Sequence, residues 1–97
     1  MSIILGIDVG GSTTKIVGIR GLETIGVLQV RARDQITSLY GAIGNFLRSF
    51  GHDLIDVAAI ALTGVGASYI DEQIYGIETR KVTEFTAIGR EIGRAHV

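Results

Sequence analysis

The sequence contains no cysteine, and its positive and negative charges nearly cancel. Without cysteine, the 97 residues cannot form a disulfide scaffold, a thiolate zinc site or a cysteine nucleophile. Nine Lys and Arg residues against ten Asp and Glu residues give a net charge of −1. This balance argues against a protein that binds duplex nucleic acid, because such proteins attract the phosphates with clustered Lys and Arg. The two histidines, His52 and His96, lack the spacing of metal ligands.

Long apolar runs are also missing from the sequence. No segment approaches the roughly 20 apolar residues that a helix needs to cross a bilayer. Residues 1–5 carry no basic side chain and lead directly into Gly6, which argues against a signal peptide. We therefore expect a cytoplasmic protein with no membrane partner. With 46% hydrophobic and 20% charged residues, the chain has the composition of one small ordered domain, or of a piece of a larger one.

Three short segments rich in β-branched residues predict an antiparallel meander. Residues 3–7, 13–19 and 24–30 have the composition of strands, and short turns that contain glycine separate them. Alternate residues of the second segment are expected to face opposite sides of the sheet.

The segment that follows the meander predicts a helix, because its apolar residues recur at helical spacing. These residues are Ile36, Leu39, Tyr40, Ile43, Leu47 and Phe50. Asp34 or Thr37 is the candidate N-cap, and Gly51 follows the end of the helix. Gly41 and Gly44 each weaken a helix by about 1 kcal/mol relative to Ala, which suggests that they allow close packing on the sheet.

The rest of the chain predicts two further strands. Residues 57–62 are continuously apolar, as in a strand that is buried on both faces of a parallel sheet. Residues 68–75 are predicted to form a helical turn and residues 78–82 the last strand, and Thr83 is the candidate N-cap of a final helix that begins at Glu84. The order β-β-β-α-β-(α)-β-α is typical of an α/β sheet of the ribonuclease-H-like class. This is the lobe of the actin-like ATPases, sugar kinases and Hsp70 proteins, and we expect it to be truncated here.

Three separate polar segments are predicted to meet at one rim of this sheet. In open α/β sheets, ligands bind beyond the carboxyl ends of the parallel strands. Asp8 ends the first strand, Thr63 and Gly64 follow the fourth, and Thr83 and Glu84 follow the fifth. We expect a ligand site where they converge.

The first of these segments, GIDVGGSTTK, has the composition of a phosphate-binding turn. Paired glycines let the backbone turn tightly and point its N–H groups at phosphate oxygens, while hydroxyl and ammonium groups add donors. Asp8 can accept a hydrogen bond from water on a bound Mg²⁺. The candidate ligands of the ATP phosphates are Asp8, Gly10, Gly11, Ser12, Thr13, Thr14 and Lys15, with Thr63 and Gly64 at the same rim. A plain hairpin turn is the alternative, since Val-Gly-Gly-Ser suits one equally well.

Two further interpretations stay open. Glu84 is either a first-turn carboxylate stabilised by the helix dipole or a general base that takes the proton of an alcohol attacking ATP. The TGVGA segment, residues 63–67, either brings the backbone close to a substrate or simply leaves the strand.

The motifs together resemble a known family. GIDVGGSTTKIVGI is similar to the first phosphate motif of the acetate-and-sugar-kinase, Hsp70 and actin superfamily. The further segments TSLYGAIGNFL, LTGVGASYI and YGIETRKVTEFTAIG resemble bacterial type II pantothenate kinases. The resemblance extends from residue 3 to about residue 90. The first motif is shared across the superfamily, whereas its combination with TGVGA and EFTAIG is much more specific.

The resemblance implies phosphorylation of pantothenate by ATP with Mg²⁺, the first step of coenzyme A biosynthesis. By position, residues 8–15 would bind the ATP phosphates, and Glu84 matches the catalytic Glu that accepts the proton of the pantothenate hydroxyl. Members of the family are homodimers, and their second phosphate loop, adenosine-binding segment and pantothenate contacts have no counterpart in this chain. We therefore expect residues 1–90 to be the N-terminal part of such a kinase and the chain alone to be inactive. Residues 91–97 depart from the family pattern, and one back-translation of them reads as a sequencing adapter, so we expect a non-native tail.

Two other functions fit parts of the pattern. The ATPase activators of 2-hydroxyacyl-CoA dehydratases have a similar GIDVGS-like loop and a TGxG segment, together with cluster-binding cysteines further along the chain. A non-catalytic nucleotide-binding domain of the actin type would use the same loop without a general base. The EFTAIG segment at Glu84 favours the kinase.

Overall fold

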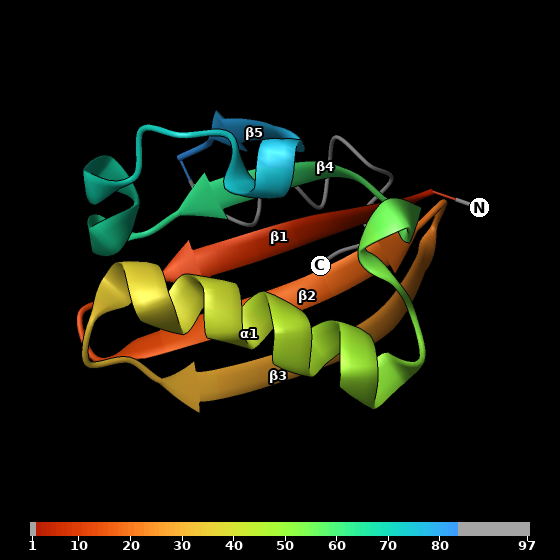
Figure 1. Cartoon of the computed structure of the whole chain (residues 1–97), viewed down its shortest axis with the longest axis horizontal. Helices are drawn as coiled ribbons and strands as arrows, with labels where there is room; N and C mark the ends of the chain where they lie inside the picture. The colour runs from red at the N-terminus through yellow and green to blue at the C-terminus, as the bar shows by residue number, and fades with distance from the viewer. Residues whose placement is uncertain (1, 84–97) are drawn as a thin grey trace.

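The computed structural model describes residues 2–83, which form a five-stranded mixed sheet with one long helix against it (Figure 1). The strand order is β3-β2-β1-β4-β5; β1, β2 and β3 are antiparallel neighbours, and β4 is parallel to both β1 and β5. The main elements are β1 (Ile3–Val9), β2 (Thr13–Arg20), β3 (Glu23–Arg31), α1 (Gln35–Phe50), β4 (Val57–Thr63) and β5 (Glu78–Lys81). The short 3₁₀ helices are η1 (Leu54–Asp56), η2 (Val65–Tyr69) and η3 (Ile74–Gly76).

The predicted meander, helix and two later strands are confirmed within one or two residues. The N-cap of α1 is Asp34, whose carboxylate accepts hydrogen bonds from the backbone N–H and the hydroxyl of Thr37. Gly51 ends the helix in the left-handed conformation, with φ of 73°, and its N–H donates to the carbonyl of Leu47. The predicted final helix from Glu84 and the predicted tail of residues 91–97 lie outside the described residues.

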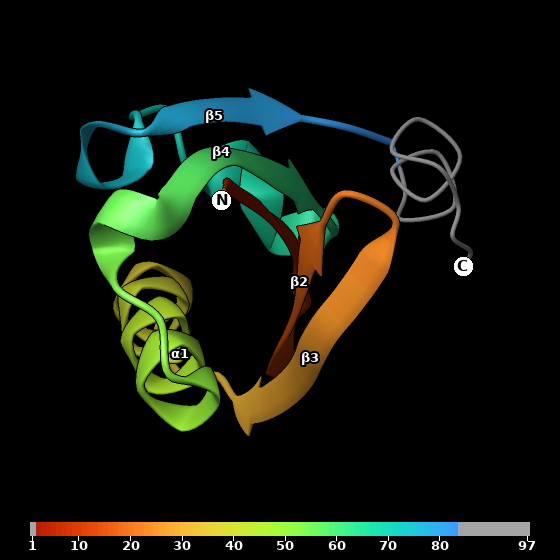
Figure 2. The same ribbon diagram turned by 90° about the vertical axis from the view of Figure 1, so that its right-hand side faces the viewer.

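The core lies between α1 and one face of the sheet (Figure 2). Alternate residues of β1 point into it and are fully buried, together with one face of α1 and of β4. The central members of this cluster are Ile3, Leu5, Ile7, Val9, Leu39, Ile43, Phe46, Ile60 and Leu62. Gly41 and Gly44 lie on the outer side of α1, where an added Cβ would meet nothing within 4 Å, so the expectation that they pack closely on the sheet is wrong.

The prediction that β4 is buried on both faces is also wrong for the described residues. Val57, Ile60 and Leu62 are buried, but Ala58 is exposed and Ala59 and Ala61 are only half-buried. Within residues 2–83 the long helix covers one face of the sheet (Figure 2). The run VAAIAL is continuously apolar, but its larger side chains pack in the core, and the positions that are not fully buried are all alanines.

Two glycines replace side chains under the C-terminal half of α1. Gly18 and Gly26 are directly opposed on β2 and β3. An added Cβ would lie 2.5 Å from Cζ of Phe46 at Gly18, and 2.6 Å from Cε1 of Phe50 at Gly26. These aromatic rings therefore rest directly on the backbone of the two strands.

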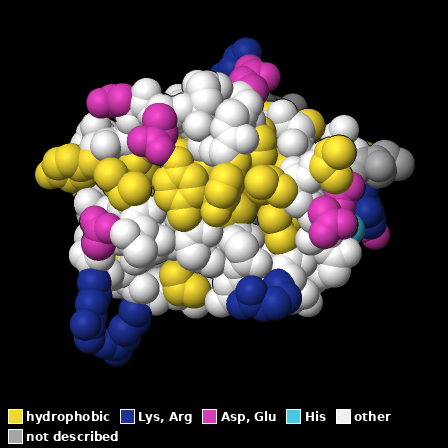
Figure 3. All heavy atoms as spheres, viewed as in Figure 1, with side chains coloured by type: hydrophobic (Ala, Val, Ile, Leu, Met, Phe, Trp, Pro, Cys, Tyr) yellow, Lys and Arg dark blue, Asp and Glu magenta, His cyan; other side chains and the backbone are white. Residues whose placement is uncertain are grey.

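The connection between β4 and β5 forms two 3₁₀ turns, η2 and η3, in place of the single helical turn predicted for residues 68–75. The helix is interrupted between them because Ile70 and Gln73 have extended backbone, and Tyr75 within η3 adopts the left-handed conformation, with φ of 54°. The Tyr75 ring packs edge-to-face on Tyr40 of α1, with centroids 4.8 Å apart. Such short turns cannot bury all their large side chains, and Val65, Tyr69 and Tyr75 stay exposed. Figure 3 shows apolar side chains gathered in a band across this side of the molecule.

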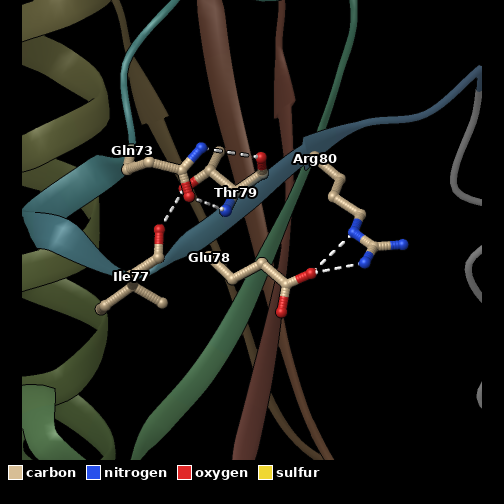
Figure 4. A network of polar contacts seen from close by, with 5 residues as sticks. All are labelled: Gln73, Ile77, Glu78, Thr79 and Arg80. Carbon is tan, nitrogen blue, oxygen red and sulfur yellow. Dashed lines mark hydrogen bonds and ion pairs between the residues drawn. The ribbon is translucent and has the colours of Figure 1, made fainter.

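A glutamine side chain covers the free edge of β5. The Gln73 amide accepts a hydrogen bond from the Thr79 N–H at 3.0 Å and donates to the Thr79 carbonyl at 3.4 Å, as a neighbouring strand would (Figure 4). The Thr79 hydroxyl in turn donates to the carbonyl of Ile77 at 2.8 Å. On the strand itself, Glu78 and Arg80 form an ion pair at 2.7 Å. The Gln73 contacts satisfy the N–H and the carbonyl of Thr79, which would otherwise be open to another strand.

Candidate functional site

The carboxyl ends of β1 and β4 bring two of the predicted site residues together. Asp8 is the register partner of Thr63 on β4 and of Lys15 on β2. Register partners on neighbouring strands point their side chains to the same face of the sheet. Because Ile7 and Val9 point into the core, Asp8, Lys15 and Thr63 form a polar row on the opposite face. The predicted convergence of the first two segments is therefore present.

The backbone that leaves β4 passes directly against the end of β1. Gly64 has φ of 96°, a conformation that L side chains rarely adopt. An added Cβ would collide with the carboxylate of Asp8 and would lie 2.6 Å from the carbonyl oxygen of Val9. The backbone at the start of the TGVGA segment therefore lies directly against β1 of the same chain.

The end of the described chain reaches the same rim. The Val82 N–H donates to the Leu62 carbonyl at 2.7 Å, and the Thr63 hydroxyl donates to the Thr83 carbonyl at 2.7 Å. Thr83, the residue that precedes Glu84, therefore lies beside Thr63 and one strand away from Asp8. Glu84, the candidate general base, lies outside the described residues.

The β1–β2 connection is a tight turn with a defined hydrogen-bond pattern. The Gly10 N–H donates to the Thr13 carbonyl at 2.9 Å, and an added Cβ at Gly10 would lie 2.8 Å from that same oxygen. The Ser12 carbonyl accepts from the N–H of Ala32, just after β3, at 2.9 Å. Gly11 and Ser12 are exposed, and their N–H groups have no hydrogen-bond partner among residues 2–83. Two adjacent open N–H groups in a turn are suited to bind an anion.

The structure separates Thr14 from the other residues of the predicted phosphate loop. Along β2, Thr13 is half-buried, Thr14 is fully buried and Lys15 is exposed. The Thr14 hydroxyl points into the interior on the α1 side and has no partner among the described residues. The expected hydroxyl donor at Thr14 is therefore not at the turn surface, because the alternation of β2 turns it inward. Lys15 lies on the opposite face, across from Asp8.

Among residues 2–83, the rim offers Mg²⁺ a single carboxylate. Residues 2–83 contain no group of three or more His, Asp or Glu side chains that could hold a metal. Asp8 alone presents a carboxylate at the end of β1, half-buried beside Gly64. This arrangement fits Mg²⁺, which commonly binds through one or two carboxylates, waters and substrate phosphates.

One residue that contacts the turn, Gln35, was not anticipated from the sequence. The Gln35 amide, at the start of α1, donates to the Gly10 carbonyl at 3.2 Å across 25 positions of the chain. At Gly66, an added Cβ would lie 2.6 Å from Cγ1 of Val9 and 2.9 Å from Nε2 of Gln35. No local sequence signal marks Gln35, because its partner is distant in the chain.

A separate pocket of about 320 Å³ lies between β5 and the turn that precedes it. Leu62 and Ile70 line it together with the polar side chains of Asp71, Gln73 and Lys81. Lys81 pairs with Asp71 at 3.1 Å, and the Gln73 amide is bound to the Thr79 backbone. Lys81 and Asp71 thus neutralise each other, and the Gln73 amide already has its partners in the Thr79 backbone. We therefore assign no ligand to this pocket.

Solved structures share this fold. The activator of the 2-hydroxyisocaproyl-CoA dehydratase from Clostridium difficile, with bound ADPNP, matches with a TM-score of 0.71 and 16% identity, over 91% of this chain and 31% of that one. Component A of the (R)-2-hydroxyglutaryl-CoA dehydratase from Acidaminococcus fermentans matches with a TM-score of 0.73 and 23% identity, over 95% and 35%. YeaZ from Pseudomonas aeruginosa matches with a TM-score of 0.58 and 16% identity, over 93% and 48%. No protein-family model matches the chain, and the comparison with curated proteins finds no match.

These similarities show that the chain shares the fold of these proteins, a five-stranded α/β sheet of the ribonuclease-H-like class. The chain spans about a third of the length of the two dehydratase-related proteins. In residues 2–83, no helix has the length and apolar character needed to cross a membrane.

Proposed function

We propose that this chain is the phosphate-binding lobe of an ATP-dependent phosphotransferase. The observation that supports this most directly is the β1–β2 turn, where the open N–H groups of Gly11 and Ser12 lie at the carboxyl end of a central strand that carries Asp8. The turn supplies neutral donors to the phosphate oxygens, and Lys15 supplies a positive charge. Mg²⁺, held by Asp8 through water, would neutralise part of the phosphate charge.

Pantothenate is the proposed acceptor, on the strength of the TGVGA and EFTAIG segments. Its hydroxyl oxygen forms a bond to the γ-phosphorus of ATP while the bond from that phosphorus to the ADP oxygen breaks. Glu84 accepts the hydroxyl proton, and the products are 4′-phosphopantothenate and ADP. Such catalysis depends on positioning and on charge stabilisation, which the rim residues of this lobe would share with the rest of the whole protein. The proposed whole protein is a homodimer.

An ATPase activator of a 2-hydroxyacyl-CoA dehydratase is the second candidate. It is favoured by the structural similarity to a 2-hydroxyisocaproyl-CoA dehydratase activator with bound ADPNP and to component A of a 2-hydroxyglutaryl-CoA dehydratase. An activator would use the same turn for the phosphates, but water would replace the alcohol as the nucleophile. A non-catalytic actin-type domain would bind the nucleotide and transfer nothing.

The deciding measurement is ADP release by the whole protein, with and without pantothenate. Release that requires pantothenate, with 4′-phosphopantothenate formed in equal amount, is the expected result. Slow release that ignores pantothenate would support the activator, and nucleotide binding without release would support the actin-type domain. Either of these outcomes would be consistent with the phosphate-binding turn but would overturn pantothenate as the acceptor.

Glu84→Gln tests the proposed general base. We expect turnover to fall by about two orders of magnitude or more while the affinity for ATP changes little, because the base acts on the acceptor proton. Glu78→Gln is the matched control, since Glu78 pairs with Arg80 on β5 and has no proposed part in the reaction. Turnover retained by Glu84→Gln would remove Glu84 from the mechanism.

A further inference from the structure

We propose that Gln35 is a positioning residue that sets the direction of the Gly11 N–H group in the phosphate-binding turn. This inference rests on the proposed function, because it assigns Gln35 a role in binding phosphate. It concerns a residue of α1 that lies outside every sequence motif of the turn.

The argument begins with the peptide group between Gly10 and Gly11. The carbonyl of Gly10 and the N–H of Gly11 belong to the same planar unit and point in opposite directions. The Gln35 amide donates to that carbonyl at 3.2 Å. Whatever holds the Gly10 carbonyl therefore also fixes the direction in which the Gly11 N–H points.

This peptide group needs an external restraint more than any other in the turn. It lies between two glycines, so no Cβ on either side limits its rotation. The neighbouring groups are held by backbone: the Gly10 N–H by Thr13 and the Ser12 carbonyl by Ala32. The Gly10 carbonyl is instead held by a side chain, that of Gln35. A donor at the carbonyl also polarises the peptide group and makes its N–H a stronger donor.

The surroundings of Gln35 keep its amide in place. Gly66 approaches so closely that a Cβ would lie 2.9 Å from Nε2 and 3.0 Å from Cδ of Gln35. Such a Cβ would also lie 2.6 Å from Cγ1 of the fully buried Val9. The η2 backbone thus closes over the glutamine, and the glycine of the TGVGA segment is what makes the room.

The test uses the 97-residue chain, with Mg²⁺ and inorganic pyrophosphate as the probe. Amide resonances of Gly11 and Ser12 are followed by nuclear magnetic resonance during the titration. Gln35→Met keeps the length of the side chain and removes the donor, and we expect it to raise the Kd for pyrophosphate about five- to tenfold, the loss of one net hydrogen bond. In the unliganded variant, the Gly11 amide proton should already resonate upfield of its wild-type position. Gln73→Met is the control, because its amide binds Thr79 on β5, and the Kd should not change.

Each outcome bears on the proposal. Equal pyrophosphate affinity in Gln35→Met, or an unmoved Gly11 resonance before ligand is added, overturns the positioning role and leaves the phosphate turn standing. A wild-type chain whose Gly11 and Ser12 resonances do not shift saturably overturns the phosphate turn and the positioning role together. Gln35→Glu is the second variant, since it keeps the shape and places an acceptor against the carbonyl. It should weaken binding at least as much as Gln35→Met, with the spread of amide resonances as the check on folding.

Discussion

Thr14 turns its hydroxyl into the core, although the motif places it among the hydroxyl donors of the turn. The side chain is fully buried between the sheet and α1, and its oxygen has no hydrogen-bond partner among the described residues. A buried polar group without a partner destabilises the folded state, because it gives up its hydrogen bonds to water. The β-branched shape of Thr14 therefore suits its position in the core, whereas its hydroxyl lowers the free energy of unfolding.

Thr14→Val tests this at the scale of one atom. Valine has nearly the same shape without the hydroxyl, so we expect the free energy of unfolding in urea to rise by about 1 kcal/mol. Thr63→Val is the matched control, because the Thr63 hydroxyl does donate, to the Thr83 carbonyl at 2.7 Å. That substitution should lower the free energy of unfolding by about 1 kcal/mol. A loss of stability in Thr14→Val would mean that its hydroxyl has a partner, such as a buried water.

Two opposed glycines decide how closely α1 rests on the meander. At Gly18, a Cβ would strike the ring of Phe46, which is fully buried and cannot move aside. At Gly26, a Cβ would strike the ring of Phe50, which is 36% exposed and can turn toward solvent. The two positions face each other across β2 and β3, yet they should tolerate a methyl group very differently.

We therefore expect Gly18→Ala to lower the free energy of unfolding by about 1–3 kcal/mol, the usual cost of overpacking. Gly26→Ala should be nearly neutral. Rotation of the Phe50 ring relieves the contact, and alanine lowers the conformational entropy of the unfolded chain, so less entropy is lost on folding. Chemical denaturation of both variants, and of Gly18→Ala combined with Phe46→Leu, measures the effect. The double variant should lose less than the sum of its two single losses. Equal losses at the two glycines would contradict the assigned contacts.

The elements that sequence patterns predicted well are those with local causes. The strands of the meander follow from β-branched residues, and the bounds of α1 follow from Asp34 and Gly51. The β4–β5 connection was predicted poorly because contacts distant in the chain shape it. Tyr75 takes the left-handed conformation while it packs on Tyr40, 35 positions earlier, and no local signal in the sequence encodes that pairing.

At the scale of the whole molecule, topology explains what could be predicted of the site. The meeting of Asp8 with Thr63 and Gly64 follows from placing β1 beside β4, since parallel neighbours end at the same rim. The role of Gln35 could not be predicted, because it depends on where α1 begins relative to a turn 25 residues away. The inward orientation of Thr14 follows from the pleat once the register of β2 is known.

A side-chain hydrogen bond joins α1 to the β4–β5 connection, and it should make the free energy of unfolding fall at high pH. The Tyr40 hydroxyl on α1 donates to the carboxylate of Glu72 in the β4–β5 connection. This hydrogen bond, with desolvation, raises the pKa of Tyr40 to about 12. In the unfolded chain the group loses its proton near pH 10. The contribution is therefore complete below about pH 10 and is lost as the pH rises toward 12, because only the unfolded state releases its proton in that window.

Tyr40→Phe isolates this contribution, because it keeps the ring contact with Tyr75 and removes the donor. We expect the variant to unfold more easily at neutral pH and to lose less stability than the wild type between about pH 10 and pH 12. Urea unfolding at pH 7, 10 and 12 gives the comparison, in which the titration of other groups cancels. Tyr69→Phe is the control, since Tyr69 is 68% exposed, and it should follow the wild-type curve. If Tyr40→Phe and the wild type decline in parallel, then the hydroxyl does not join α1 to the β4–β5 connection in solution.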